Sequence, residues 1–133
     1  MNPIHHLDCV EYLGFGKPGE LKRIQDPSWV DVEGAIRKMD NYYFPIVELH
    51  CDFGDDESVF LIIGGSGRWA LLNLSGEWEY ENPEGLDDDI ELWKSDQGYS
   101  SKEKNTLVDI EKVLNIIRMF FKTGNYIALK GMI

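Results

Sequence analysis

The segment that most restricts the fold of this chain is residues 59–74, VFLIIGGSGRWALLNL. Two apolar runs rich in β-branched and aromatic residues flank a glycine-rich turn, a pattern that predicts a β-hairpin at the centre of a sheet. The first run, residues 59–63, is apolar at every position, so its periodicity does not show whether one sheet face or both are covered. In the second run Ala70, Leu72 and Leu74 share one face. A sheet this apolar requires other elements to cover it.

The glycines of this segment, in Gly64-Gly65-Ser66-Gly67, have two interpretations. A phosphate-binding loop requires a helix N-terminus directly after the glycines, but here the chain continues as a strand from Arg68. A hairpin turn that uses glycine for positive φ is therefore favoured. The hairpin contains no nucleophile, base or metal ligand, so the function is expected to lie in the segments around it.

Two helices are predicted to supply the cover. Ser28 is a suitable N-cap for a helix over residues 28–40, in which Val32 and Ile36 fall at helical spacing. Asp109 is a suitable N-cap for a second helix with a wide apolar stripe, and Gly124 is suited to end it.

Strands are predicted around these helices and the hairpin. Residues 45–53 alternate between apolar and polar, as in a strand with one face exposed. Further strands are predicted at residues 5–15, 77–81, 90–93 and 126–129, while residues 95–105 are polar and predict a loop. The order of elements predicts one α+β domain over residues 1–133, with an antiparallel or mixed sheet of about five to seven strands and two helices packed on one face.

Charge and cysteine content narrow the function. The formal net charge is −11, and residues 52–96 contain thirteen acids and two bases. This balance argues against nucleic acid and anionic membranes as partners, because both require clustered basic residues. Cys9 and Cys51 are the only cysteines and fit reduced core thiols, and the sequence shows no signal peptide or membrane-spanning run. We therefore expect a cytoplasmic protein.

Three polar residues, Glu48, His50 and Asp52, share one face of the strand at residues 45–53. They could hold a metal or act as an acid–base set, but a solvated or partner-contacting face would have the same pattern. His5, His6 and Cys9 also have a passable ligand spacing, near a terminus where a frayed end is the simpler interpretation. No second cluster completes a ligand shell and no catalytic triad is apparent, so we predict no enzyme, cofactor or bound metal.

The acidic run around Asp87-Asp88-Asp89 does not match a calcium-binding EF-hand loop. It could be a solubilising loop, or a surface on which acids steer a basic partner and aromatic residues anchor it. We predict the second role. The residues expected to bind are Asp55, Asp56, Glu57, Trp78, Glu79, Glu81, Glu84, Asp87, Asp88, Asp89 and Trp93.

Three motifs occur in a recognisable order. They are the paired glycines within IIGGSGRW at residues 62–69, the step Leu107-Val108-Asp109 before the second helix, and FFKTG at residues 120–124. In this pattern, over residues 29–129, the chain resembles the first-numbered immunity-protein family of bacterial polymorphic-toxin and contact-dependent growth inhibition systems. The resemblance implies a non-enzymatic protein that binds and neutralises one cognate toxin domain, often a nuclease or another nucleic-acid-directed enzyme.

Two alternatives belong to other functional classes. One is a small metal-dependent enzyme that uses Glu48, His50 and Asp52. The other is a scaffold module or homodimer built on the second apolar face of the hairpin. The sequence leaves open whether the chain is a monomer or a homodimer.

Overall fold

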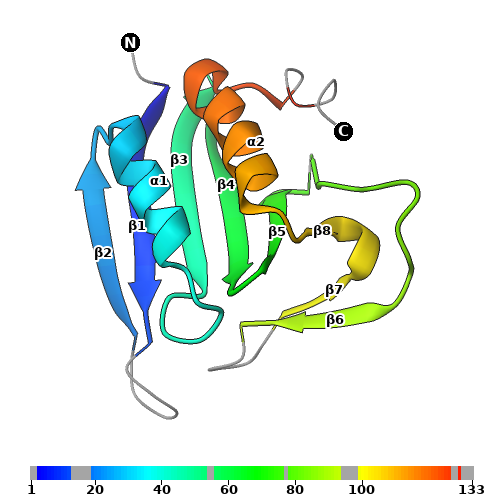
Figure 1. Cartoon of the computed structure of the whole chain (residues 1–133). Coiled ribbons are helices and arrows are strands. Elements are labelled where there is room, and N and C mark those ends of the chain that lie inside the picture. The colour runs from blue at the N-terminus through cyan, green and yellow to red at the C-terminus, as the bar shows by residue number, and fades with distance from the viewer. Residues whose placement is uncertain are drawn as a thin grey trace.

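A computed structural model describes residues 3–12, 19–53, 56–76, 78–93, 99–126 and 129. The described chain is α+β, with a six-stranded sheet, a two-stranded sheet and two α-helices (Figure 1). The elements are β1 (Ile4–Glu11), β2 (Glu20–Gln25), α1 (Trp29–Lys38), β3 (Ile46–Phe53), β4 (Asp56–Gly65), β5 (Arg68–Asn73), β6 (Asp89–Leu92), β7 (Tyr99–Lys102), a 3-10 helix (Glu103–Asn105), β8 (Thr106–Leu107) and α2 (Ile110–Thr123).

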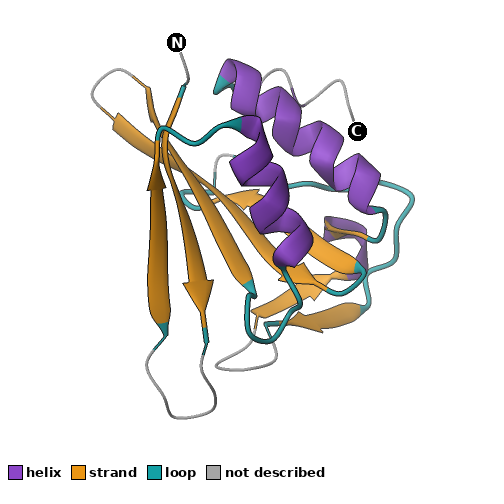
Figure 2. Cartoon of the chain, turned by 60° about the vertical axis from the view of Figure 1, so that its left-hand side comes forward, coloured by secondary structure: helices purple, strands orange, loops and turns teal. Residues whose placement is uncertain are grey.

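The main sheet has the order β2-β1-β3-β4-β5-β8, and every neighbouring pair is antiparallel. Both helices lie on one face of this sheet, as predicted (Figures 1 and 2). The core between them is formed by the inward residues of the sheet, such as Leu49, Phe60 and Ile62, and by the buried stripes of α1 and α2. Neither described helix has the length and apolar character needed to cross a bilayer.

Capping side chains define the starts of both helices, and a glycine ends α2. Ser28 accepts a hydrogen bond from the backbone N–H of Asp31, and the Asp31 carboxylate accepts one from the Ser28 N–H, which completes a capping box. Asp109 caps α2, and Gly124 ends it in the left-handed conformation with φ 62°. The predicted starts of both helices and the end of α2 are confirmed, whereas α1 stops at Lys38, two residues before the predicted end.

The hairpin is confirmed as β4 and β5, joined by a turn at Ser66 and Gly67 in which both residues have positive φ. At Gly65, glycine is required because of a close contact. A Cβ at this position would lie 2.5 Å from the carbonyl carbon of Met39, because the loop after α1 packs directly on the strand. The glycines thus serve the turn and this close contact, as the hairpin interpretation predicts.

The second face of the hairpin is covered within the chain. Ile46, Leu61, Ile63 and Ala70 form a separate apolar cluster with Leu92 of β6, on the sheet face opposite the helices. This cluster explains why residues 59–63 are apolar at every position. It therefore buries much of the apolar face on which the scaffold or homodimer alternative was based, although Leu74, which was expected on that face, is 61% exposed.

Several predicted elements were wrong or incomplete. β2 was not predicted, and β7 and the 3-10 helix occupy a stretch that was expected to be loop. A short strand was expected at residues 77–81; within the described part, residues 78–81, the structure has only an isolated bridge between Leu72 and Glu79. The first strand ends at Glu11, and the rest of its predicted range includes residues 13–15, which are outside the described chain.

The predicted closing strand at residues 126–129 is also wrong. Tyr126 and Leu129 are in 3-10 conformation, and the edge of the sheet beside β5 is taken by β8. Tyr126 packs its ring on Phe60, and its hydroxyl accepts a hydrogen bond from the Asn73 side chain at 2.7 Å. Its aromatic character therefore serves the core between sheet and helix, not a strand.

Candidate functional site

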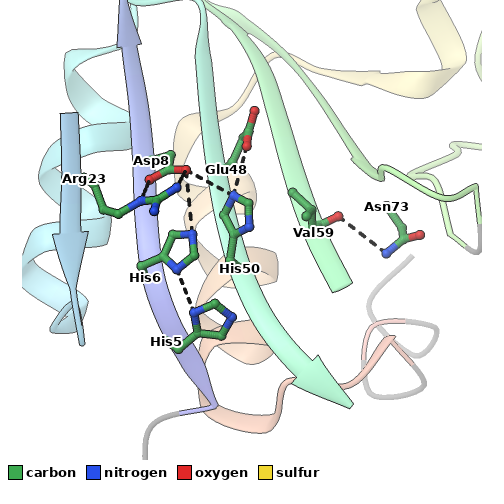
Figure 3. A network of polar contacts seen from close by, with 8 residues as sticks. All are labelled: His5, His6, Asp8, Arg23, Glu48, His50, Val59 and Asn73. Carbon is green, nitrogen blue, oxygen red and sulfur yellow. Dashed lines mark hydrogen bonds and ion pairs between the residues drawn. The ribbon is translucent and has the colours of Figure 1, made fainter. Parts of the chain in front are cut away.

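Polar side chains of β1 and β3 meet on the sheet face opposite the helices. Antiparallel pairing sets His6 opposite His50 and Asp8 opposite Glu48. We call these four residues, with Arg23 of β2, the histidine cluster (Figure 3). A register shift between Ile4 and His6 positions them, because the extra residue lets Ile4 and Leu7 both enter the helix-side core while His6 and Asp8 face the other way.

The nitrogens of two imidazoles lie beside two carboxylates in this cluster. His50 Nε2 is 2.9 Å from Glu48 Oε1 and 3.3 Å from Asp8 Oδ2, and His6 Nε2 is 3.7 Å from the same Asp8 oxygen. The rings of His6 and His50 are stacked, with centroids 4.1 Å apart and planes 22° apart. His5 completes the row, with its Nδ1 2.6 Å from His6 Nδ1.

Asp8 is the electrostatic centre of the cluster. Its side chain is only 4% exposed, and Arg23 donates to both of its oxygens, from Nε to Oδ1 at 2.7 Å and from Nη2 to Oδ2 at 2.9 Å. The hydrogen bonds from Arg23 lower the pKa of Asp8 despite its burial. Burial, followed by the nearby charge of His50, lowers the pKa of His6. At neutral pH the cluster therefore combines an ionised Asp8 with a neutral His6.

Sequence reasoning found part of this cluster. Glu48 and His50 lie on one strand face as predicted, whereas the side chain of Asp52 lies outside the description. Cys9 is not with His6, because it faces the helix-side core, where Cys51 is also buried. Asp8 was missed. Its signal was the alternation of His6 and Asp8, which matches that of Glu48 and His50 on the opposite strand.

A second polar region runs from Glu79 to Glu91, and we call it the acidic segment. It contains seven acids and no base. Its backbone is fixed against the 3-10 helix, because Asn82 N–H donates to Lys104 O at 2.7 Å and Lys104 N–H donates to Leu86 O at 3.0 Å. The N–H of Glu103 donates to Asp88 O at 2.8 Å. The segment is therefore an ordered surface, although its residues before β6 belong to no named helix or strand.

The acids of this segment are exposed, and only some have basic neighbours. Asp87 pairs with Lys104 at 2.8 Å and Asp89 with Lys102 at 2.6 Å. No ion pair to Glu81, Glu84 or Asp88 is present among the described residues, so these three carboxylates are available to a basic partner. The pKa of Glu79 is raised, first by partial burial and then by the charge of Glu81.

The predicted aromatic anchors need correction. Trp78 is 7% exposed and packs against Phe60 and Tyr126, so it is a core residue and not a surface anchor. Trp93 is half-buried beside the apolar cluster of the second face and packs on Tyr12. The apolar side chain that the acidic segment does present is Leu86, which is 58% exposed.

The acids expected just before the hairpin are not placed with this surface. Asp55 lies outside the described residues. Asp56 and Glu57 belong to the start of β4, where only their backbone is described. The candidate surface therefore consists of Glu79, Glu81, Glu84, Asp87, Asp88 and Asp89 of the predicted set, with Leu86 added.

Comparison of the chain with protein-family models, with curated proteins and with solved structures gives no match.

Proposed function

We propose that this chain is an immunity protein that binds a cognate bacterial toxin domain in the cytoplasm and neutralises it through the acidic segment. The action is stoichiometric and non-enzymatic, since binding alone blocks the toxin. The order of the three sequence motifs, which resembles that of the first-numbered immunity-protein family, supports this class of function. The partner it implies is a protein.

The observation that carries the proposal is the fixed backbone of the acidic segment. A solubilising loop has no need of a defined conformation, whereas a binding surface gains from one, because less conformational entropy is lost on association. Here backbone hydrogen bonds to residues 103–104 hold the segment at three places. Gly85 reinforces the fit, since a Cβ on it would lie 2.7 Å from Lys104 Cα.

The charge of this surface defines the partner's chemistry. Glu81, Glu84 and Asp88 are exposed on the same segment as Leu86, whose side chain is also exposed. Carboxylates attract a basic cleft from a distance and speed association, while an apolar side chain contributes once water is displaced. A toxin that acts on nucleic acid has such a basic cleft, because it must hold phosphates.

We do not propose catalysis, because the two imidazoles and Asp8 of the histidine cluster are largely buried. The side chain of Asp8 is 4% exposed and those of His6 and His50 are each 11% exposed. A catalytic metal or acid–base pair must keep a position open to substrate. Replacing His50 with Ala separates the classes, since an enzyme would lose its activity while this protein would still protect against its toxin.

The direct test is protection in cells. The reading frame upstream of this gene is expected to encode a large secreted protein with a variable C-terminal domain. Expression of that domain in a laboratory strain should stop growth, and co-expression of this chain should restore it. Asp88→Lys should weaken the rescue, while Glu20→Lys, a charge reversal on β2, should not. Failure of the unmodified chain to protect would contradict the proposal.

A further inference from the structure

We propose that the histidine cluster is a binding site for a late first-row divalent metal ion, with zinc as the ion to test first. The ligands are His6 Nε2, His50 Nε2 and Asp8 Oδ2, and Glu48 brings a second carboxylate to the same place. The ion would join β1 to β3. This inference is independent of the proposed immunity function, because it concerns the other polar region of the molecule.

The donor set and its spacing support the assignment. Two imidazoles and a carboxylate suit zinc and its neighbours, whereas calcium and magnesium prefer oxygen ligands alone. The three donor atoms lie within 4.8 Å of one another, and the Asp8 oxygen is 3.3 Å and 3.7 Å from the two nitrogens. Tetrahedral zinc with bonds of about 2.0 Å holds its ligand atoms about 3.3 Å apart.

An unsatisfied atom points to the same place. His6 is 8% exposed, and its Nε2 is buried with no hydrogen-bond partner among the described residues. Buried polar atoms of side chains are rarely left this way, because the loss of hydration is not repaid. A metal ion between His6 and Asp8 would satisfy this nitrogen.

The other nitrogen of His6 is arranged as in known metal sites. His6 Nδ1 lies 2.6 Å from His5 Nδ1, and this contact requires one proton between the two nitrogens. When His6 supplies that proton, its Nε2 carries the lone pair that a metal needs. Donation from the far nitrogen to an outer partner is the usual way to orient a ligand histidine.

Binding requires a small change in the rings. The planes of His6 and His50 are 22° apart, so their in-plane lone pairs run nearly side by side and do not meet. The His6 ring must turn to share an ion with His50; this breaks no described hydrogen bond at Nε2, although the His5 contact at Nδ1 must adjust with the ring. His50 Nε2, which faces carboxylates at 2.9 Å and 3.3 Å, exchanges its proton for the ion.

The charges of the cluster accept a cation. Asp8 and Glu48 contribute two negative charges when ionised and Arg23 contributes one positive charge, so these three groups together carry one negative charge in excess. Arg23 donates to both Asp8 oxygens, which keeps the carboxylate ionised and oriented. Each carboxylate oxygen has a second lone pair, and that of Oδ2 remains for the ion.

Calorimetric titration of the full chain with zinc chloride tests the site. We expect one equivalent to bind the unmodified protein, and His6→Gln to bind at least tenfold more weakly. The matched control is Glu84→Gln with Asp88→Asn, which removes two exposed carboxylates of the acidic segment and should leave zinc affinity unchanged. Calcium chloride should not bind at this site. Cobalt(II) should give a visible absorption band that His6→Gln removes.

His6→Gln is chosen because its Nε2 makes no described hydrogen bond, so the variant should fold; far-ultraviolet circular dichroism in the presence of a chelator verifies this. If this variant does not fold, Asp8→Asn replaces it in the same titration. Absence of stoichiometric zinc binding to the unmodified chain would overturn the inference. Equal affinity in the variant, or loss of binding in the acidic-segment control instead, would overturn it as well.

Discussion

The histidine cluster and the acidic segment both gather ionisable side chains, but they handle charge in opposite ways. In the cluster, Asp8 is buried and held by Arg23, and burial lowers the pKa of His6. In the segment, carboxylates such as Asp88 remain exposed, while the backbone that carries them is fixed by hydrogen bonds. In the histidine cluster, polar contacts hold the side chains in place, whereas in the acidic segment, hydrogen bonds hold the backbone and leave the side chains exposed. A site that binds an ion needs positioned side chains. A surface that binds a protein needs an ordered backbone with accessible side chains.

The largest effect on stability should come from breaking the central ion pair of the cluster. Arg23→Ala leaves the buried Asp8 carboxylate without its main partner, which we expect to lower the free energy of unfolding by about 3 kcal/mol. Lys22→Ala is the control, because Lys22 pairs with Glu11 at 3.1 Å on the same two strands but in a more exposed setting. Its effect should be much smaller. Urea denaturation measures both, and equal losses would contradict the central role given to Asp8.

A smaller effect is expected from disturbing the fixed backbone of the acidic segment. Gly85→Ala places a Cβ 2.7 Å from Lys104 Cα, and overpacking of this kind costs about 2 kcal/mol. Gly34→Ala is the control, since a Cβ there has nothing within 4 Å and the helix gains propensity. Thermal or urea denaturation should show a loss for the first variant and none for the second. Unchanged stability of Gly85→Ala would show that the segment is not packed as described.

The two regions should also differ in the sign of their pH dependence. Because the pKa of His6 is lowered on folding, the unfolded chain binds the extra proton below its own pKa of about 6.5. Stability should therefore fall as the pH drops from 7 towards 5, by at most about 1.4 kcal/mol per pH unit for this one group. His6→Gln should remove that part of the slope.

Glu79 provides the comparison of opposite sign. Its pKa is raised on folding, so the folded chain binds the extra proton, and this contribution to stability is lost as the pH rises through the raised pKa. Glu79→Gln should therefore steepen the loss of stability at acid pH. Denaturation curves at several pH values check both variants. The same change of slope for His6→Gln and Glu79→Gln would refute this assignment of burial and charge.

Local signals predicted the helices and the hairpin, but edge elements were missed. Ser28, Asp109 and Gly124 act within one turn of their own position, so their roles are readable from the sequence alone. β2 was missed because all six of its side chains are exposed, and Leu21 and Ile24 do not alternate as in a strand with one buried face. It is an edge strand, defined by its partner β1 rather than by its own pattern.

The two candidate sites likewise differ in whether local sequence or tertiary pairing defines them. The acidic segment was predictable because its charges are adjacent in the sequence, although Trp78 was misplaced since an alternating strand pattern does not say which face is buried. The histidine cluster depends on the register between β1 and β3 and on the shift between Ile4 and His6. Register is a tertiary property, and no spacing within one strand reveals it.

The smallest effect on stability, and the largest on function, is expected from charge reversal in the acidic segment. Glu84 and Asp88 are exposed and have no ion pair among the described residues, so their replacement by Lys should leave the free energy of unfolding nearly unchanged. Rim charges of this kind act mainly on the rate of association and on its dependence on salt.

The central claim is that this segment is the surface that meets the toxin, and association kinetics test it most directly. The rate constant for binding to the cognate toxin domain should be measured at several ionic strengths, for the unmodified chain, for Glu84→Lys with Asp88→Lys, and for Glu20→Lys. We predict that the double variant associates at least tenfold more slowly at low salt and shows a weaker salt dependence, while Glu20→Lys matches the unmodified chain. Unchanged kinetics in the double variant would contradict the account.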